Sequence, residues 1–474
     1  MYSNEHVSNF MKDLKIINNY CNQNNPFEYN DQTLQEKQSV IFSRLETGLI
    51  IRNVETFGNL VHFQNAHSIP VQRWYPYREG YSLDLVTTFL KELDVKGITF
   101  DPFSGSGTTL LASRINGLKS FGVDINPISV LVSKVENERY SHLEIQLLRR
   151  ITDQVKKLPI LQEEMNTSFN LADKIFNREI LQALLSIKSY VRTIENEKIK
   201  NLVYVAWLSI IEEVSNIKKE GNGIKYKNRK RTSLGYIDID KEIWEKSNYP
   251  ENKFEFVRSK IVYQLELMIN DLQFNYGSTS NTPGIFWGNC LEFDKLFQDD
   301  IEFTFFSPPY CNCFDYFEIH KVELWLGDFI TNQSDLKALR SQGFRSNTNS
   351  LDHKSIVYRN ENIENLISLF DHENLWSKNI PHVVRGYFDD FHTLLQKLHK
   401  QTIKGGSIGI VVGNSAYSGV IIPSDIIIAE IAREVGFKIM NISVARHLTT
   451  SSQQKMKLET LNYYLRESIV LLQK

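Results

Sequence analysis

Two short segments of the chain hold residue types in an order suited to chemistry, and the first is Asp101-Pro102-Phe103-Ser104-Gly105-Ser106-Gly107-Thr108-Thr109. Gly105 and Gly107 let the backbone approach a ligand closely, because neither carries a Cβ. A helix that begins after the glycines would present free N–H groups at its N-terminus. The loop therefore predicts a site for a nucleotide-like cofactor, and a tight structural turn is the alternative interpretation.

The second segment is the tetrapeptide Ser307-Pro308-Pro309-Tyr310. Each proline fixes φ and lacks a backbone donor, so the turn is stiff and its carbonyls are left as acceptors. The Ser307 oxygen and the Pro308 carbonyl are suited to accept hydrogen bonds from a planar exocyclic amine, and Tyr310 offers a stacking platform for its heterocycle. Such a site would act by positioning and polarisation. A rigid turn at the end of a strand is the alternative.

The elements around the first segment must place it at the edge of a sheet. Residues 98–100 form a short β-prone run that ends at Asp101. Residues 110–115 predict a helix, and residues 119–124 predict a second strand that ends in Asp124. We expect Asp101 to receive an amino group of the cofactor and Asp124 to accept both hydroxyls of a ribose. Strand, glycine loop, helix and strand form the opening half of a Rossmann-like α/β sheet.

The elements around the tetrapeptide predict the rest of that sheet. Residues 301–306 form a buried-strand candidate that delivers Ser307, and residues 408–413 are another fully buried strand. Residues 437–446 and 467–472 are expected to form a final antiparallel pair. We therefore predict an α/β fold in which the two segments share one sheet.

A block of helical pattern interrupts this sheet. From about residue 141 to 280 apolar residues recur at helical steps, and strand signals resume only at residues 285–287. We expect a catalytic domain over 67–140 and 281–474, with the helical block as an insertion over 141–280. Residues 1–66 are expected to form an N-terminal helical segment.

The glycine loop and Ser-Pro-Pro-Tyr together resemble the two signature motifs of DNA amino-methyltransferases, which use S-adenosylmethionine (AdoMet) to methylate exocyclic nitrogens of bases. The serine form of the tetrapeptide is similar to enzymes that act on N4 of cytosine, whereas relatives acting on N6 of adenine more often carry an acid or asparagine there. The resemblance covers about residues 70–135 and 285–474. It implies a class I AdoMet methyltransferase sheet and a target base that is flipped out of the duplex.

The resemblance also implies roles for individual residues. The segment from Arg73 to Ser82 corresponds to a motif that lines the methionine end of the cofactor, and Asn289 corresponds to a polar contact beside the adenine. The catalytic residues implied are Ser307, Pro308, Pro309 and Tyr310. The cofactor-binding residues expected are Tyr75, Ser82, Asp101, Phe103, Gly105, Gly107, Thr108, Asp124 and Asn289.

The order of the motifs leaves the target base open. The cofactor loop precedes the tetrapeptide, with a long block between them, and this order is similar to adenine methyltransferases that place target recognition in that position. The expected reaction is methylation of cytosine N4 in duplex DNA, within a restriction–modification or defence system that includes a cognate restriction endonuclease. Adenine-N6 methylation, methylation of an RNA base, and a non-catalytic AdoMet- or DNA-binding subunit are the alternatives.

Several further segments have two interpretations. Residues 314–317 form either a wall of the base pocket or ordinary helix packing, and residues 413–415 are a candidate border of that pocket. His320, Lys321 and Glu323 are expected on a solvated helix face.

A basic stretch that is interrupted by glycines is the first candidate for contact with DNA phosphates. The alternative interpretation of this stretch is a charged face exposed to solvent. Residues 340–359 are a second candidate, and Arg446 with Gln453, Gln454 and Lys455 is a third. The DNA-binding residues expected from the first stretch are Lys225, Lys227, Arg229, Lys230 and Arg231.

The composition sets limits on these interpretations. The chain has 474 residues, of which 42% are hydrophobic, and it is expected to fold as more than one domain. With 54 basic and 56 acidic side chains, bulk charge does not indicate a nucleic-acid partner, so any attraction must be local. The four cysteines predict reduced thiols and no metal site. The N-terminus predicts no secretory signal. We expect a cytoplasmic protein without membrane segments.

Overall fold

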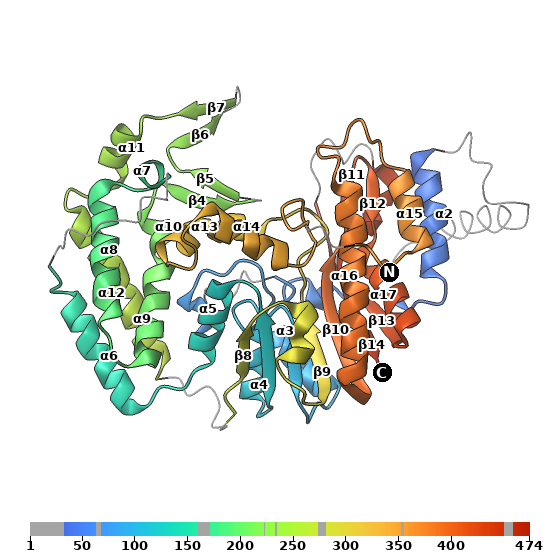
Figure 1. The fold of residues 1–474 in the computed structure, drawn as a ribbon, viewed down its shortest axis with the longest axis horizontal. Helices are drawn as coiled ribbons and strands as arrows, with labels where there is room; N and C mark the ends of the chain where they lie inside the picture. Colours follow the sequence, from blue (N-terminus) through green and yellow to red (C-terminus); the bar gives the residue numbers. More distant parts are fainter. Residues whose placement is uncertain are drawn as a thin grey trace, which may run out of the picture.

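The structure is a computed structural model that describes residues 33–62, 68–159, 171–221, 223–232, 235–273, 281–351, 355–449 and 458–474. Its centre is an eight-stranded sheet with the strand order β1-β13-β14-β10-β9-β2-β3-β8 (Figure 1). Every neighbouring pair in this sheet is parallel except the two that β14 makes with β10 and β13. The strands are β1 (Ile51–Asn53), β2 (Thr99–Asp101), β3 (Ser120–Asp124), β8 (Gly284–Trp287), β9 (Ile301–Phe306), β10 (Thr402–Gly413), β13 (Lys438–His447) and β14 (Arg466–Gln473).

A large, mostly parallel sheet with this one reversed strand is consistent with a class I methyltransferase. The predicted antiparallel pair at the end of the chain is confirmed, because β13 and β14 pair from Lys438–Gln473 to His447–Arg466. The strands predicted around both motifs are also present, as β2, β3, β9 and β10.

The order in which successive strands are added to the sheet reverses at β2. From β2 the chain proceeds to β3 and β8 on one side, and then returns to β9 on the other side of β2. Thr99 pairs with Phe303 and Phe100 with Thr304, so β2 and β9 are parallel neighbours. Ligands of open α/β sheets bind at such a switch point, beyond the carboxyl ends of the strands. The glycine loop follows β2 and Ser307 follows β9, so the two motifs lie next to each other.

Helices cover both faces of the sheet. On one face, α3 (Leu83–Glu92) and α4 (Thr108–Ile115) pack with Phe303 and Phe305 of β9. On the other, α16 (Ile380–Gln401) and α17 (Ser424–Val435) pack with Phe306. These phenylalanines are fully buried, which explains why β9 is a continuous apolar run.

The inserted block has its own hydrophobic core beside the β8 edge of the sheet (Figure 1). That core also includes residues of α5 (Pro127–Asn137) and α13 (Tyr316–Leu326), so the block is packed onto the catalytic part. Its helices are α6 (His142–Val155), α7 (Ala172–Ile175), α8 (Arg178–Arg192), α9 (Glu197–Ser209), α10 (Ile211–Val214), α11 (Lys241–Asn248) and α12 (Lys253–Asp271).

The block is not wholly helical, which corrects the prediction for this region. Four short strands form two antiparallel hairpins, β4 (Ile217–Glu220) with β5 (Gly223–Tyr226) and β6 (Arg229–Thr232) with β7 (Gly235–Asp238). In β4 the side chains alternate between buried and exposed, as in a strand with one covered face. The density of charge in this stretch hides that alternation in the sequence.

The N-terminal prediction is correct for one helix only. α2 (Leu34–Glu46) begins with a capping box between Thr33 and Glu36. Gly48 then adopts a φ of 76°, and Ile51–Asn53 pair with β13 as strand β1. A helix is therefore wrong for the strand residues, which follow the left-handed turn at Gly48 and pair at the sheet edge. The expectations for residues 1–32 and 63–67 lie outside the described residues.

Residues 328–380, which read as polar and irregular, contain α14 (Gln333–Gln342) and α15 (Glu361–Ser368). Across the described ranges, no helix is long and apolar enough to cross a membrane. Within the same ranges, no group of three or more His, Cys, Asp or Glu side chains is placed to hold a metal ion. Cys290, Cys311 and Cys313 are free thiols, and Cys21 lies outside the described residues.

Candidate active site

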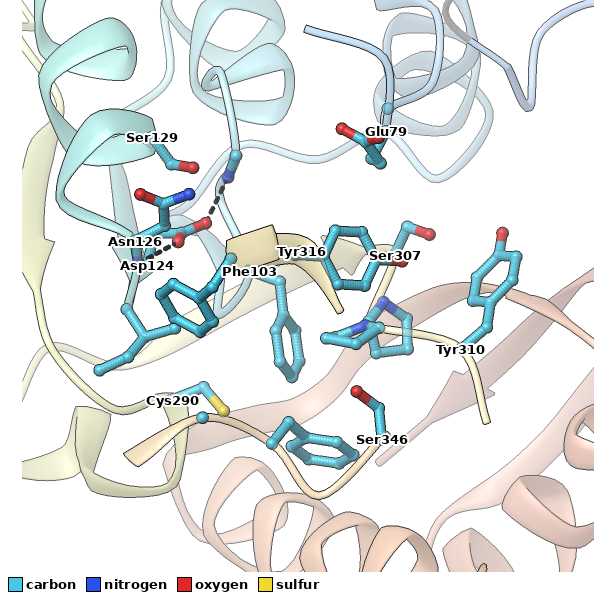
Figure 2. A pocket seen from close by; sticks show the side chains of 18 of the residues that line it. Glu79, Phe103, Asp124, Asn126, Ser129, Cys290, Ser307, Tyr310, Tyr316 and Ser346 are labelled. Atoms are coloured by element: carbon cyan, nitrogen blue, oxygen red, sulfur yellow. Dashed lines mark hydrogen bonds between the residues drawn. The ribbon is translucent and has the colours of Figure 1, made fainter. Parts of the chain in front are cut away.

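A cavity opens at the carboxyl ends of β2, β3 and β9, and residues of both motifs line it (Figure 2). The glycine loop contributes Phe103 and Gly105 to the cavity wall, and the end of β3 contributes Asp124. All four residues of the tetrapeptide line the same cavity, as does Asn289 from the start of η4 (Cys290–Lys295). The two motifs, which lie about two hundred residues apart in the sequence, therefore share one site.

The carboxylate of Asp124 is held by two backbone donors. The N–H of Gly105 donates to one oxygen at 2.9 Å, and the N–H of Asn126 donates to the other at 2.8 Å (Figure 2). Gly105 has a φ of 51°, and a Cβ there would lie 3.1 Å from the Tyr77 ring, so the tight approach requires glycine. Burial raises the pKa of Asp124 to about 6, whereas the two N–H groups lower it. This oriented acceptor is suited to a diol such as a ribose.

Asp101 lies beneath the loop rather than in the cavity wall, which differs from its expected role. Its carboxylate accepts from the Tyr81 hydroxyl and from the N–H of Phe103, both at 2.9 Å, and only 1% of the residue is exposed. Burial raises the pKa of Asp101 to about 7. The residue braces the turn that presents Phe103, and it is not placed to receive an amino group from a ligand in the cavity.

Four other expected cofactor residues also support the site from outside the cavity wall. Gly107 caps α4 with a φ of 90° and packs against Ser133, and Ser82 caps α3. The Thr108 hydroxyl accepts from Gln72 at 3.2 Å. Tyr75 is fully buried, and its hydroxyl lies 3.4 Å from the His320 ring.

The tetrapeptide is anchored through Tyr310. Its hydroxyl donates to Glu467 of β14 at 2.5 Å, and the same carboxylate accepts from Arg446 of β13 at 2.5 Å. Burial and the Glu467 charge together hold the pKa of Tyr310 well above its usual range, so the phenol stays neutral. A Cβ at Gly413 would lie 2.6 Å from the Tyr310 ring. Gly413 thus supports the ring from behind, although it is not in the cavity wall.

Helix α13 contributes residues whose role the sequence did not indicate. Tyr316 and Phe317 line the cavity, in agreement with one of the two interpretations of residues 314–317. His320 also lines it, although it was expected in solvent. Glu323 is equally buried and pairs with Lys219 of β4 at 2.6 Å, so the prediction of a solvated face is wrong for both residues. Their burial comes from the insertion, which packs on this helix.

The basic stretch does not act as a single charged loop. Lys227 donates to the carbonyls of Glu212 and Ser215 at 2.7 Å, so it holds the insertion together and is not free for DNA. Lys225 pairs with Glu220 at 2.9 Å on the surface. Arg229 pairs with Asp238 at 3.3 Å and lies over the Tyr236 ring, Lys230 is exposed, and the Arg231 side chain lies outside the described part of the structure.

The other two candidates for DNA contact are also changed by the structure. Arg345 is buried between Asp389 and Asp390, at 2.6 and 2.5 Å, and Arg340 pairs with Asp315 at 2.8 Å. These arginines anchor the segment, so it is not an adaptable loop at this end. Arg446 belongs to the cavity, and residues 453–455 lie outside the described residues.

Comparisons with known proteins find similarity to Type II methyltransferases. The chain is 26% identical over 426 residues to the Type II methyltransferase M.AvaI of Nostoc sp. (strain PCC 7120 / SAG 25.82 / UTEX 2576), covering 84% of this chain and 85% of that protein. It is 25% identical over 443 residues to M.BsoBI of Geobacillus stearothermophilus, covering 86% of both. It is 26% identical over 359 residues to M.MvaI of Kocuria varians, covering 71% and 74%. No family model matches the chain. These similarities support a relationship of the chain to the methyltransferase family.

Proposed function

We propose that this protein is an AdoMet-dependent DNA methyltransferase that forms N4-methylcytosine in duplex DNA. The observation that carries the proposal is the single cavity lined by Asp124, the glycine loop and the tetrapeptide Ser307–Tyr310. Homologues named as Type II methyltransferases support DNA methylation with AdoMet as the methyl donor. The serine at the first position of the tetrapeptide favours cytosine N4 over adenine N6.

The residues of the cofactor end fit AdoMet. Asp124 presents an oriented carboxylate for the ribose hydroxyls, and Gly105 leaves room beside it because it lacks a Cβ. Phe103 and Cys290 give that end an apolar lining, and Asn289 supplies a polar contact at its border. Bound AdoMet would supply an electrophilic methyl group.

The tetrapeptide prepares the nucleophile. The exocyclic amine of a base is a weak nucleophile because its lone pair is delocalised into the ring. Acceptors at the Ser307 oxygen and the Pro308 carbonyl would hold both amine hydrogens and favour a pyramidal nitrogen. Tyr310, fixed by Glu467, would stack on the base, which must first leave the helix at a cost of a few kcal/mol.

The domain roles follow from this assignment. Residues 67–140 and 281–474 would form a Rossmann-like catalytic domain, and residues 141–280 would recognise the target sequence. Residues 1–66 would form an N-terminal segment, of which strand β1 completes the sheet edge. The exposed β6–β7 hairpin, with Arg229 and Lys230, is the surface best suited to phosphate contact. A cognate restriction endonuclease is the partner that a Type II system would supply.

Transfer of a labelled methyl group tests the proposal. The full chain is incubated with methyl-labelled AdoMet and either duplex DNA from a host without methyltransferases or total RNA, and the products are digested to nucleosides. Label in N4-methylcytosine supports the proposal, and its loss in Ser307→Ala assigns the reaction to this site. Label in N6-methyladenine would correct the target base, and label only in RNA would contradict a DNA substrate.

A further inference from the structure

Three carboxylates line the cavity within the described part of the chain, and two of them already have partners. Asp124 is held by the backbone of the cofactor loop, and Glu467 is shared by Arg446 and Tyr310. Glu79 is the third, on the loop between Tyr75 and α3. It forms no ion pair or side-chain hydrogen bond with a described residue, and its polar contacts are the backbone N–H groups of Arg78 and of Glu79 itself.

Glu79 lies at the tetrapeptide end of the cavity. In Figure 2 its side chain is on the side of Ser307 and Tyr316, whereas Asp124 is toward the opposite side. Tyr316 and Ser307 line this cavity together with Glu79. Glu79 also lines a second hollow beside Asn312, which lies two residues after Tyr310.

Methylation of an amine leaves a proton to be removed. As the nitrogen–carbon bond forms, the carbon–sulfur bond breaks with its electron pair on sulfur, and the nitrogen becomes positive until it loses one hydrogen as a proton. Ser307 and the Pro308 carbonyl are hydrogen-bond acceptors but very weak bases. A carboxylate in reach can accept the proton during the transfer.

We propose, building on the function above, that the Glu79 carboxylate is the general base that takes the proton from the methylated amine. The acceptance of this proton makes Glu79 a neutral carboxylic acid, which returns the proton to water through the open mouth of the cavity. Glu79 would therefore be a catalytic residue: one of the two amine hydrogens, first held by Ser307 or Pro308, passes to its carboxylate once the nitrogen–carbon bond has formed.

The surroundings of Glu79 define how the reaction depends on pH. Burial raises the pKa of Glu79, and Lys219 of β4 and the adjacent Arg78 act in the opposite direction. The other groups that face it are neutral near pH 7, because burial raises the pKa of Tyr75, Tyr77 and Tyr316 and lowers that of His320. Only the ionised form of Glu79 accepts a proton, so the rate should fall as the pH falls through its pKa.

Single-turnover methyl transfer as a function of pH tests this role in the full chain, with saturating AdoMet and the unmethylated duplex DNA described above. Glu79→Gln is expected to lower the rate about 100-fold at pH 8, the usual range for loss of a general base, and to abolish the fall in rate at low pH. Its AdoMet and DNA dissociation constants should stay within about twofold of the wild-type values, since general-base loss acts on the chemical step. Glu92→Gln, an exposed carboxylate on α3, is the matched control and should behave as wild type.

Glu79→Asp covers the case in which the glutamine variant does not fold. It keeps a carboxylate one methylene shorter, so transfer should be slower while the fall in rate at low pH remains. A wild-type rate and pH profile in Glu79→Gln, or loss of that fall in Glu79→Asp, would overturn the role of Glu79 while methylation by the wild type still stands. Failure of the wild type to methylate DNA would instead remove the proposed function and this inference with it.

Discussion

The hydroxyl of Tyr310 donates a hydrogen bond of 2.5 Å to Glu467, across 157 positions of the sequence. This hydrogen bond fastens the turn after β9 to the antiparallel strand β14, and Arg446 holds the carboxylate from the neighbouring strand. The position of Tyr310, which we propose stacks on the target base, therefore depends on the final pair of strands as well as on its own motif.

Removal of this hydrogen bond should impair transfer more than cofactor binding. Glu467→Ala leaves the Tyr310 ring unanchored, and a misplaced platform is expected to lower kcat about 10- to 100-fold. The AdoMet dissociation constant, measured by calorimetry, should stay within about threefold, since the loss is one of orientation in the transition state. Glu434→Ala is the control, because it removes a similar bond from Tyr358 on another part of the surface. Equal effects of the two substitutions would contradict the role of Glu467.

AdoMet binding should weaken in acid because of Asp124. Its pKa is raised by burial to about 6, so the carboxylate that we propose accepts from the ribose becomes protonated as the pH falls through that value. We expect the wild-type AdoMet affinity to decline from pH 7.5 to pH 5. Asp124→Asn should bind weakly and with no such slope. An affinity in the wild type that does not change over this range would contradict the assignment of Asp124.

Asp101 should make the stability of the protein depend on pH. Its folded-state pKa is about 7 and its ordinary value is 3.8, so the folded state prefers the protonated acid. The stability gained from this preference is present in full below pH 4 and is lost as the pH rises toward 7. The loss is on the order of 4 kcal/mol.

Asp101→Asn mimics the protonated acid and should remove this loss. Without AdoMet, the midpoint of thermal unfolding should fall less between pH 5 and pH 8 in Asp101→Asn than in the wild type. Thr88→Ala, a change at a half-buried position of α3, serves as the control for a general effect of substitution. Parallel pH profiles for wild type and Asp101→Asn would show that ionisation of Asp101 does not destabilise the folded state.

The β6–β7 hairpin should contribute to DNA affinity through charge. Arg229→Glu together with Lys230→Glu should weaken binding and reduce the slope of log K against log salt by about 0.9 for each phosphate that the hairpin no longer neutralises. Lys404→Glu, at the opposite end of β10 from the cavity, should leave the slope unchanged. Identical salt slopes for the hairpin variant and the wild type would place the phosphate-binding surface elsewhere.

The sequence predicted those parts of the site that are formed by residues close together in the chain. The loop after β2 and the turn after β9 each follow directly from a strand with a local sequence pattern, and parallel pairing of the two strands brings them together. The resemblance to known motifs could identify them for the same reason. Gly105 and Asp124 line one cavity with the tetrapeptide because strand ends in a parallel sheet share one edge, and their contact with a cofactor stays a prediction.

The errors concern residues whose surroundings come from distant parts of the chain. His320 and Glu323 look like polar positions of a surface helix, and only the packing of β4 and Lys219 makes them buried. Lys227 looks like a phosphate ligand, but three backbone carbonyls of the insertion surround its ammonium group. Glu79 lies within the segment from Arg73 to Ser82, for which the resemblance implied only a cofactor contact, and the cavity alone places it near Ser307.

A crystal structure of the chain with AdoMet tests the central claim most directly, since that claim is that one cavity joins the cofactor loop to the tetrapeptide. We predict that the ribose hydroxyls lie within hydrogen-bonding distance of Asp124 and that the methyl group faces Ser307 and Pro308. AdoMet bound with its methyl group directed away from the tetrapeptide, or bound outside this cavity, would contradict the account.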